Sequence, residues 1–518
     1  MRYHRPRAPF CGIGQCTNCL VRTPARQNVR DCMQGFATPG AERSSNGWPS
    51  TRFDLGAIVD LLFPRGIDTL RGFRRPTWAV PFYQRVVRSL SGYGYPPTNP
   101  PERRPSAPLE REVDIAIVGG GTSGQATFET LRAEGIESLC LLDRRAPPAG
   151  FPDPELARTT AVFLPPPDRA RTHPFLLLAS REDGRAVVLR SRRVVVATGA
   201  YDASLLFAGN DRPGVMTADG AFAFASFGFE PFRRGIVFGD GDRARAVVER
   251  FDDRVAAVVA PGEIGPDLTR AASDRGIPLY PRSLLVRAHG RRWVHSVALR
   301  LRGRGAELTV AGDAVVLAHR RVPHPQLFFQ AGARMRWSPT TGAYYPSTDP
   351  AGATNVPGLY AVGEARGPLR GEQIAGSGRT TARAIARAEP PGEEAEPTVS
   401  EEVPHPLEGY YRELLHVDPG LAKWVACPCE DILLHEVVDA HARGYRGIEV
   451  IKRFTGLGTG LCQGRYCLPD ALLVLAILES RPPNEVGFIT QRPPVVPTAL
   501  GTLASAAQLL RPPEGGPP

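Results

Sequence analysis

The stretch VDIAIVGGGTSGQ, residues 113–125, sets the fold class of this 518-residue chain. An apolar strand over 113–118 runs into Gly119-x-Gly121-x-x-Gly124, a helix is expected over about 123–134, and a second strand ends at Asp143. The first glycine permits a tight turn, the second lets backbone approach a pyrophosphate, and the third allows close helix packing. Asp143 is placed to accept a hydrogen bond from a ribose hydroxyl. An ordinary glycine turn is the alternative, but the full motif favours a dinucleotide site.

A second strand and glycine turn follow further along the chain. The strand over 235–238 leads into GDGDRA at 239–244, a degenerate form of the fingerprint whose glycines are Gly239 and Gly241. The two aspartates of this turn would repel a pyrophosphate, whereas Glu263 is placed to bind a ribose. The sequence leaves open whether NAD(P) or another nucleotide binds here, or whether the turn is vestigial.

Two further glycine-bearing segments end apolar runs, ATG at 197–199 and GLYAVGE at 358–364. Both resemble motifs of flavoproteins that contain two dinucleotide-binding domains. The resemblance implies that Thr198, Gly199, Gly363 and Glu364 contact FAD, with Glu364 standing where those families usually have Asp. A helix expected over about 372–388 would direct its N-terminal amides toward the flavin, where they favour negative charge.

Eight of the nine cysteines form two groups with the spacing of iron–sulfur ligands. The first group has the plant-type C-x4-C-x2-C pattern of a [2Fe–2S] cluster followed by a fourth cysteine. The second group pairs C-x-C with C-x4-C, beside Lys452, Arg453 and Arg465, whose charges would offset that of a four-thiolate cluster. The expected metal ligands are Cys11, Cys16, Cys19 and Cys32 in the first group, and Cys427, Cys429, Cys462 and Cys467 in the second. Zinc is the alternative for each group, because four thiolates also bind zinc.

The remaining cysteine, Cys140, lies inside the apolar strand SLCLLD. We expect it to be a small buried core residue rather than a redox thiol. No residue in the chain is assigned a catalytic role from the sequence.

Composition excludes several classes of protein. The net charge is +10, but the basic residues are almost all arginines and are scattered, which argues against nucleic-acid binding. No apolar run approaches the about 18 residues of a membrane span. The N-terminus has no apolar signal-peptide core, and thiols in ligand spacing imply a reducing compartment. We therefore expect a cytoplasmic protein.

The expected fold class is α/β, with a Rossmann-type flavoprotein core of two dinucleotide-binding domains. A truncated ferredoxin-like [2Fe–2S] domain would precede this core, and a small helical [2Fe–2S] domain would follow it. The expected segments are a ferredoxin-like domain at 1–40, a connector at 41–110, an FAD/NAD(P)-binding domain at 111–390, an acidic linker at 391–406, a helical [2Fe–2S] domain at 407–485, and a C-terminal helix and tail at 486–518.

Taken together, the motifs resemble one family over nearly the whole chain. The stretches are YHRPRAPFCGIGQCTNCLV, VDIAIVGGGTSGQ, RRVVVATGAYDASLLFAGNDRPGVM, LYAVGEA and CPCE…KRFTGLGTGLCQGRYC. They are similar to the FAD- and iron–sulfur-containing α-type subunits of heteromeric amine and imino-acid dehydrogenases. This group includes sarcosine oxidase, proline and hydroxyproline dehydrogenases, opine oxidases and hydrogen cyanide synthase. The last stretch is similar to the bacterioferritin-associated-ferredoxin type of [2Fe–2S] domain.

The resemblance implies a function for this chain. A partner flavoprotein subunit would hold a small amine or imino acid and oxidise its C–N bond. This chain would carry the electrons onward through FAD and two [2Fe–2S] clusters. The long folate-binding C-terminal domain of sarcosine oxidase α is not among these residues, so one-carbon transfer is not expected. The alternative is a self-contained NAD(P)H-dependent flavin and iron–sulfur reductase that uses the turn at 239–244.

Overall fold

The structure of the protein is a computed structural model, which divides into two compact units. Unit 1 comprises residues 1–100, 202–320 and 404–489, and unit 2 comprises 101–201, 321–403 and 490–518. The structure describes residues 4–24, 27–38, 40–42, 47–58, 77–94, 106–145, 152–302, 307–390, 392, 406–417, 421, 423–507 and 509. Much of the connector expected at 41–110, nearly all of the linker expected at 391–406, and the tail after 509 lie outside the described residues.

Unit 2 is built on a mixed sheet in the order β4-β3-β7-β6-β5, with β20 also pairing with β7. β3 runs parallel to β4 and β7, and β20 runs parallel to the end of β7, whereas β6 is antiparallel to β7. The strands are β3 (Leu109–Val118), β4 (Leu139–Leu142), β5 (Thr159–Phe163), β6 (Phe175–Arg181), β7 (Ala186–Val196), β17 (Arg321–Pro323), β18 (Met335–Ser338), β19 (Ala343–Pro346) and β20 (Leu359–Ala361). The helices are α3 (Thr122–Ala133), η4 (Pro154–Leu156), α7 (Gln326–Gln330), η6 (Gly363–Ala365), α8 (Glu372–Ala386) and α14 (Leu500–Ala506).

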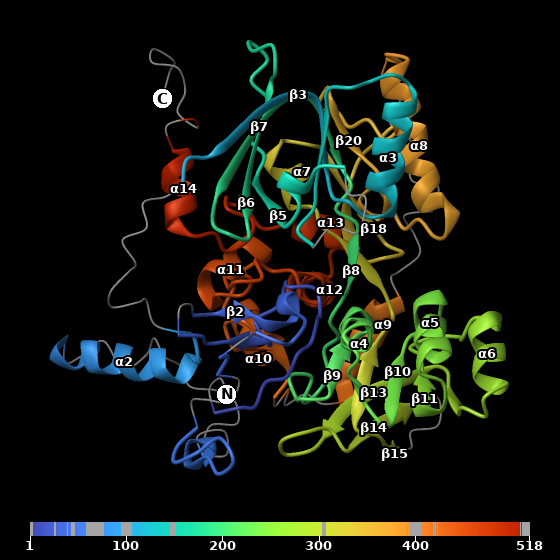
Figure 1. Cartoon of the computed structure of the whole chain (residues 1–518). Helices are drawn as coiled ribbons and strands as arrows, with labels where there is room; N and C mark the ends of the chain where they lie inside the picture. The colour runs from blue at the N-terminus through green and yellow to red at the C-terminus, as the bar shows by residue number, and fades with distance from the viewer. Residues whose placement is uncertain are drawn as a thin grey trace. The chain divides into compact units, whose positions relative to one another are not determined.

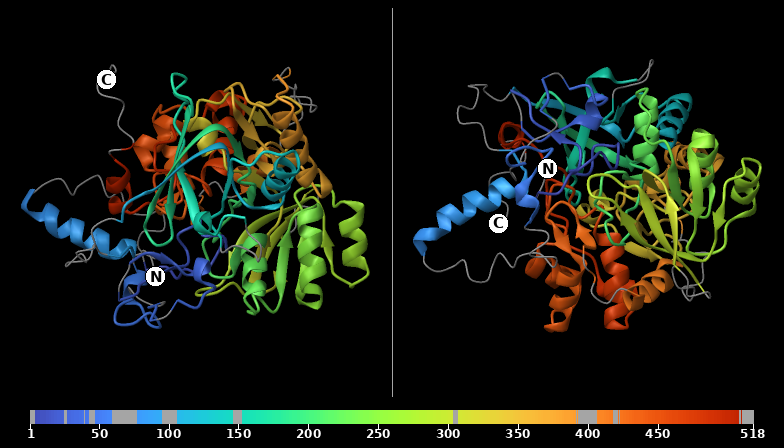
Figure 2. Two further views of the ribbon diagram at one scale, coloured as in Figure 1. Left: turned by 45° about the horizontal axis from the view of Figure 1, so that its top comes forward. Right: turned by 90° about the horizontal axis from the view of Figure 1, so that it is seen from below.

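Both faces of this sheet are buried, which explains the continuous apolar run in β3. Ala116 and Val118 pack into one hydrophobic cluster, while Ile115 and Ile117 point to the other face and pack with Ile385 of α8. Strands covered on both faces have such unbroken apolar sequences. Helices α3 and α8 lie side by side against the sheet (Figures 1 and 2). The predicted strand, turn and helix at 113–134 are confirmed. The end of the strand and both ends of the helix lie within two residues of their predicted positions, whereas the strand begins at Leu109, four residues before its predicted start.

Unit 1 contains a parallel sheet in the order β12-β11-β10-β16-β9 and an antiparallel sheet β13-β14-β15. Its strands are β1 (Leu20–Val21), β2 (Val29–Arg30), β9 (Val215–Thr217), β10 (Gly235–Phe238), β11 (Val255–Val259), β12 (Leu279–Tyr280), β13 (Ser283–His289), β14 (Ser296–Leu301), β15 (Glu307–Ala311), β16 (Ala314–Leu317), β21 (Val425–Cys427) and β22 (Ile432–Leu433). A further short strand, β8 (Ala200–Asp202), lies where the chain passes from unit 2 to unit 1.

The helices of unit 1 are η1 (Asp31–Gln34), η2 (Leu55–Ala57), η3 (Thr77–Ala79), α2 (Val80–Ser91), α4 (Ala218–Ser226), α5 (Asp242–Phe251), η5 (Asp252–Arg254), α6 (Pro266–Ser273), α9 (Pro406–Val417), α10 (Leu434–Ala442), α11 (Ile448–Thr455), α12 (Leu468–Glu479) and α13 (Pro483–Val486). The sequence did not predict α2, which lies in the expected connector. The mixed α/β fold class, with two strand–glycine turn–helix starts and a helical C-terminal part, is confirmed. None of the helices within the described ranges combines the length and apolar character that crossing a bilayer requires.

Candidate cofactor sites

The first glycine turn, between β3 and α3 in unit 2, is closed on one side and open on the other. A Cβ atom at Gly124 would lie 1.8 Å from the carbonyl oxygen of Gly119, and one at Gly119 would lie 2.4 Å from that of Ala197. A Cβ atom at Gly121 would meet no protein atom within 4 Å. Gly119 and Gly124 therefore allow the backbone to pack, whereas Gly121 borders space that a ligand can fill at the start of α3.

Two polar side chains border this turn. Asp143 follows β4 and accepts a hydrogen bond from the amide of Gly120 at 2.7 Å, which fixes the turn, and another from the amide of Arg145 at 2.7 Å. Thr198 follows β7, and its buried hydroxyl has no hydrogen-bond partner among the described residues. Buried polar atoms are rarely left unpaired in native proteins. The open space at Gly121 and the unpaired hydroxyl of Thr198 together fit a bound cofactor.

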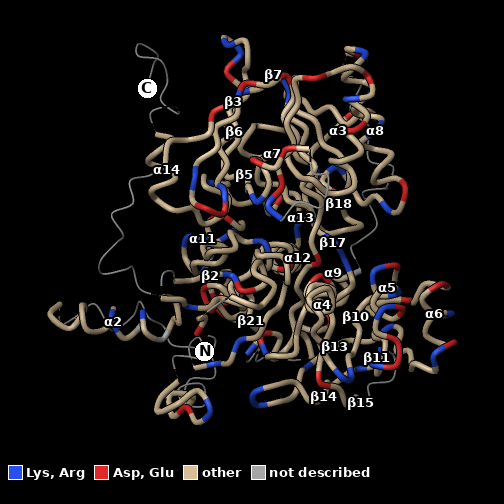
Figure 3. The backbone as a smooth tube through the Cα atoms, viewed as in Figure 1, with Lys and Arg blue, Asp and Glu red and all other residues tan. Residues whose placement is uncertain are grey.

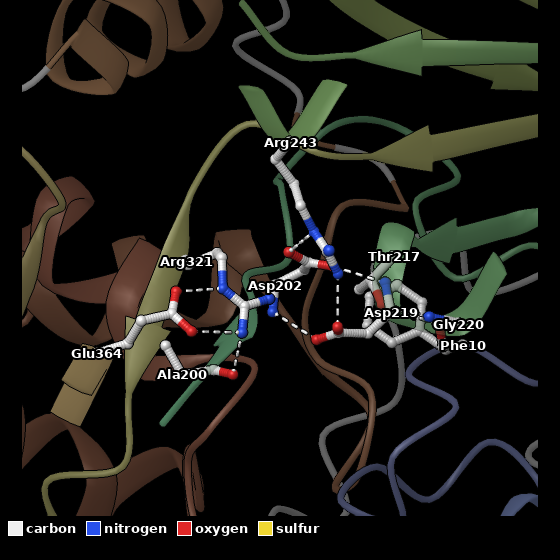
Figure 4. Close-up of polar contacts among 9 residues, drawn as sticks. All are labelled: Phe10, Ala200, Asp202, Thr217, Asp219, Gly220, Arg243, Arg321 and Glu364. Carbon is white, nitrogen blue, oxygen red and sulfur yellow. Dashed lines mark hydrogen bonds and ion pairs between the residues drawn. The ribbon is translucent and has the colours of Figure 1, made fainter. Parts of the chain in front are cut away.

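The second predicted flavin segment lies at the end of β20. Gly363 has a φ of +63° and donates its amide hydrogen to the hydroxyl of Ser377 at 2.8 Å, which ties the segment to α8. The Glu364 carboxylate forms a two-pronged ion pair with Arg321 at 2.6 and 3.0 Å (Figure 4). Arg321 also donates to the carbonyl of Ala200. The motif did not reveal Arg321, which holds Glu364 in place.

The glycine turn of unit 1, between β10 and α5, repeats this backbone arrangement. A Cβ atom at Gly239 would lie 2.5 Å from the carbonyl oxygen of Ala318, whereas one at Gly241 would meet no protein atom within 4 Å. Ala244 occupies the third position and is fully buried. Glu263, the predicted ribose ligand, instead pairs with Arg282, and both side chains are largely exposed. The turn retains the open position that a nucleotide requires.

A charged network surrounds Arg243, the side chain that projects from this second turn. Its guanidinium forms two hydrogen bonds to Asp202, at 2.9 and 2.8 Å, and one to Asp219 at 2.5 Å (Figure 4). The two carboxylates also accept each other's backbone amides, and Asp202 is almost completely buried. Arg243 further lies over the ring of Phe222, 4.8 Å from its centroid. The positive charge at this turn is therefore neutralised by the protein itself.

The four N-terminal cysteines form one buried group in unit 1. The sulfurs of Cys19 and Cys32 are 3.4 Å apart, and hydrogen bonds join Cys11 to both Cys16 and Cys32. Amides of the loop point at the sulfurs, since Gly14 donates to Cys32 at 3.2 Å and Cys16 donates to Cys11 at 3.3 Å. Amides directed at thiolates stabilise the charge of a bound cluster.

The four C-terminal cysteines form a second buried group, also in unit 1. Hydrogen bonds join Cys427 to Cys429 and Cys467, and Cys429 to Cys462. Buried Arg465 donates to the carbonyl of Cys462 at 2.7 Å, which places its guanidinium beside this loop. The other two predicted cations differ, because Lys452 and Arg453 both pair with Glu449 of their own helix α11.

In each group, hydrogen bonds from neighbouring thiols lower the pKa of one cysteine. Burial favours the neutral thiol, but hydrogen bonds from Cys16 and Cys32 keep the pKa of Cys11 well below its usual value. Hydrogen bonds from Cys427 and Cys462 lower the pKa of Cys429 in the same way. Those same contacts raise the pKa of Cys16 and of Cys462.

Iron binding would therefore displace protons from these buried thiols. Across the described residues, no three or more His, Cys, Asp or Glu side chains converge as the ligands of a single metal ion. A two-iron cluster takes two thiolates on each iron. Four buried thiols in each group are the ligand number of a [2Fe–2S] cluster, and equally that of a zinc ion.

Cys140 and the basic residues agree with their sequence interpretation. Cys140 lies on β4 with 1% of its surface exposed, and burial raises its pKa to about 12, so the thiol is not reactive. Basic and acidic residues are interspersed along the described part of the chain, as Figure 3 shows.

Comparison with known proteins identifies two segments of the chain. Residues 1–39 match the family described as 2Fe-2S iron–sulfur cluster binding domain, in agreement with the spacing of the first cysteine group. Residues 423–507 match the family described as Sarcosine oxidase A3 domain, which contains the second cysteine group.

Three proteins are similar over much of the chain. The alpha subunit of sarcosine oxidase from Rhizobium meliloti is 26% identical over 98% of this chain, which spans 54% of that protein. An opine oxidase subunit from Agrobacterium tumefaciens is 24% identical over 76% of this chain and 91% of that protein. The crystal structure of L-proline dehydrogenase from P. horikoshii superimposes with a TM-score of 0.55 at 22% identity, covering 76% of this chain and 80% of that chain.

The structural match confirms the fold, and the sequence matches confirm the predicted relationship to α-type subunits of heteromeric amine and imino-acid dehydrogenases. The chain spans about half the length of the sarcosine oxidase subunit that it matches. The chain is therefore similar to the alpha subunit of sarcosine oxidase and to an opine oxidase subunit, and its residues 423–507 match the Sarcosine oxidase A3 domain.

Proposed function

We propose that this chain is the electron-transferring, FAD- and [2Fe–2S]-dependent subunit of an oxidoreductase complex that oxidises a small amine or imino acid. The observation that carries the proposal is the pair of buried groups of four cysteines, whose neighbouring thiols are hydrogen bonded to one another, in a chain that also carries a flavin-type glycine turn. The names of its relatives, oxidases of sarcosine and opines, support the class of reaction.

FAD would be held by unit 2. The open position at Gly121 and the N-terminus of α3 would receive its pyrophosphate, since helix N-termini favour anions. The Asp143 carboxylate would use its remaining lone pairs to accept a hydrogen bond from a ribose hydroxyl. Thr198 and Gly199 would border the flavin. Gly363 and the Arg321-bound Glu364 would lie along the ribityl arm.

The eight cysteines would bind two [2Fe–2S] clusters in unit 1. The ligands would be Cys11, Cys16, Cys19 and Cys32 for one, and Cys427, Cys429, Cys462 and Cys467 for the other. FAD exchanges one or two electrons and each cluster exchanges one, so together they connect hydride chemistry to single-electron carriers. The protein buries all eight cysteines and supplies amide donors to the sulfurs of the first group.

The substrate would be oxidised in a partner flavoprotein subunit, and the complex would be cytoplasmic. Gly239 and Gly241 leave room for NAD(P) or another nucleotide, but we propose no tight binding there. The charge of Arg243 beside that turn is already neutralised by Asp202 and Asp219, which disfavours strong binding of NAD(P) phosphates.

The test is an anaerobic visible spectrum of the purified chain together with its flavin and iron content. We expect one FAD and two irons for each cysteine group. NADH, proline or sarcosine added to the chain alone should leave the spectrum unchanged, whereas adding a partner flavoprotein with its amine substrate should bleach it. Direct bleaching by NADH would instead support a self-contained reductase, the alternative favoured by the open position at Gly241. A colourless protein would contradict both functions.

A further inference from the structure

The two cysteine groups lie against each other within unit 1, although hundreds of residues separate them in sequence. The hydroxyl of Tyr93 donates to the carbonyl of Cys429 at 2.9 Å. The ring of Phe10, beside Cys11, packs edge-on against that of Tyr466, beside Cys467, with 5.3 Å between centroids. The N-terminal part of the chain thus contacts the loops of the second group at two separate points.

An ion-pair network reinforces this contact. Arg7 bonds to Asp211 at 3.0 Å and to Asp431 at 3.4 Å, and Arg5 pairs with the same two carboxylates. Asp431 follows Cys429 by two residues, and both arginine side chains are largely buried. Arg5 and Arg7 also keep the pKa of Asp211 low against the effect of burial. The N-terminal arm is thus held beside the second cysteine group by buried charges.

Thr17 makes the most direct contact between the groups. It lies between Cys16 and Cys19 in the first loop, and only 1% of its surface is exposed. Its hydroxyl donates to the sulfur of Cys429, in the second group, at 3.5 Å. A residue that adjoins one predicted cluster ligand therefore hydrogen bonds to a predicted ligand of the other cluster.

We propose that Thr17 is a positioning residue that couples the two clusters, with its hydroxyl raising the reduction potential of the cluster bound by Cys429. Reduction adds one electron to that cluster and hence negative charge to its sulfurs, which a hydrogen-bond donor stabilises. The inference rests on the proposed function, because it requires a cluster in each cysteine group. It adds that the two sites are coupled, because a residue of the first cysteine loop sets part of the reduction potential of the second cluster.

The experiment is a redox titration of both clusters, followed by electron paramagnetic resonance, in the full chain and in Thr17→Val. We expect the equilibrium constant for reduction of the C-terminal cluster to fall by up to about tenfold. Its reduction potential would then fall by up to about 59 mV, since one electron is transferred. The N-terminal cluster should keep its potential, since its amide donors remain. Thr17→Ser, which retains a hydroxyl, should restore the original value.

Two further variants make the measurement specific. Cys467→Ser should change or abolish only the C-terminal signal, which assigns the two signals. Tyr93→Phe removes a hydrogen bond to the carbonyl of Cys429 and not to its sulfur, so its effect on the potential should be clearly smaller than that of Thr17→Val. In the unmodified chain, the two signals should broaden or split only when both clusters are reduced, because adjacent spins interact.

The outcomes separate this inference from the proposed function. If both clusters are present and Thr17→Val shifts neither potential, or shifts both equally, the coupling role is wrong while the proposed function stands. Independent signals in the fully reduced chain would also contradict it. Iron sufficient for one cluster or none would overturn the inference and the two-cluster function together. Should Thr17→Val not fold, Thr17→Ala removes the same hydroxyl with a smaller side chain and should lower the potential in the same way.

Discussion

The two glycine turns have the same backbone arrangement and different surroundings. In both, the first glycine packs against a neighbouring strand end and the middle glycine borders open space. Thr198 adjoins Gly119 of the first turn, and its buried hydroxyl has no partner among the described residues. At the second turn, by contrast, Arg243 is engaged by two carboxylates. The motif therefore predicts the backbone shape of the turn, whereas the surrounding side chains determine whether a charged ligand binds there.

The largest effect is expected for Gly124→Ala. The added methyl group would overlap the carbonyl of Gly119, so the turn must open, at a cost of about 3 kcal/mol or more. We expect the flavin band to disappear from the visible spectrum and the melting temperature to fall. The matched control is Ala244→Gly at the corresponding position of the second turn, which should leave the flavin content unchanged. Normal flavin in Gly124→Ala would show that the first turn does not bind FAD.

The next effect is expected for Arg243→Met in the second turn. It leaves the buried Asp202 without its cation, and breaking such a pair costs about 2–3 kcal/mol when part of the arginine is exposed. Urea unfolding should show the loss. The double variant Arg243→Met/Asp202→Asn should recover part of it, because the uncompensated charge is gone. A variant that keeps its stability and binds nucleotide more tightly at the second turn would show that the contacts of Arg243 with Asp202 and Asp219 block that site.

A smaller and more selective effect is expected for Gly121→Ala. Gly121 has φ −77°, which alanine adopts without strain, and no protein atom lies in the way. The apoprotein should be equally stable or gain up to about 1 kcal/mol. FAD affinity, measured by fluorescence titration, should fall by about tenfold to a hundredfold, because the methyl group occupies ligand space.

Gly241→Ala is the matched substitution in the second turn. It should leave FAD affinity and stability unchanged, since its position is equally open and the flavin is expected elsewhere. Equal losses of FAD affinity in both variants would remove the distinction between the turns.

The sequence predicted features that depend on neighbouring residues. The apolar run over 113–118, the glycine turn and the following helix form a local pattern, so the end of the strand and both ends of the helix were right within two residues. The spacing of the first cysteine group likewise identified a segment that matches an iron–sulfur domain. The helix α2 was missed although Tyr83, Val87 and Leu90 recur at helical spacing, because its first turn has no side-chain cap and the residues before it are rich in Arg and Pro.

Features that depend on distant residues were not predictable in this way. Arg243 meets Asp202 across 41 residues, and Thr17 meets Cys429 across 412. The interleaving of the two units also has no local signal, because the chain leaves unit 2 after Tyr201 and returns at Arg321. No periodicity or motif encodes which distant side chains a fold brings together. A charged residue inside a glycine turn, such as Arg243, indicates only that an oppositely charged partner is needed nearby.

The smallest effect is expected for Thr198→Val, which removes the unpaired hydroxyl near the first turn. In the apoprotein this hydroxyl is buried without a partner among the described residues, so its removal should not destabilise unit 2. If the hydroxyl bonds to the cofactor, FAD affinity should fall by about fivefold, corresponding to about 1 kcal/mol. Thr198→Ser, which keeps the hydroxyl, should bind FAD like the original chain. Unchanged affinity in Thr198→Val would place the flavin away from this residue, and the contrast between the two turns would then rest on Gly121 alone.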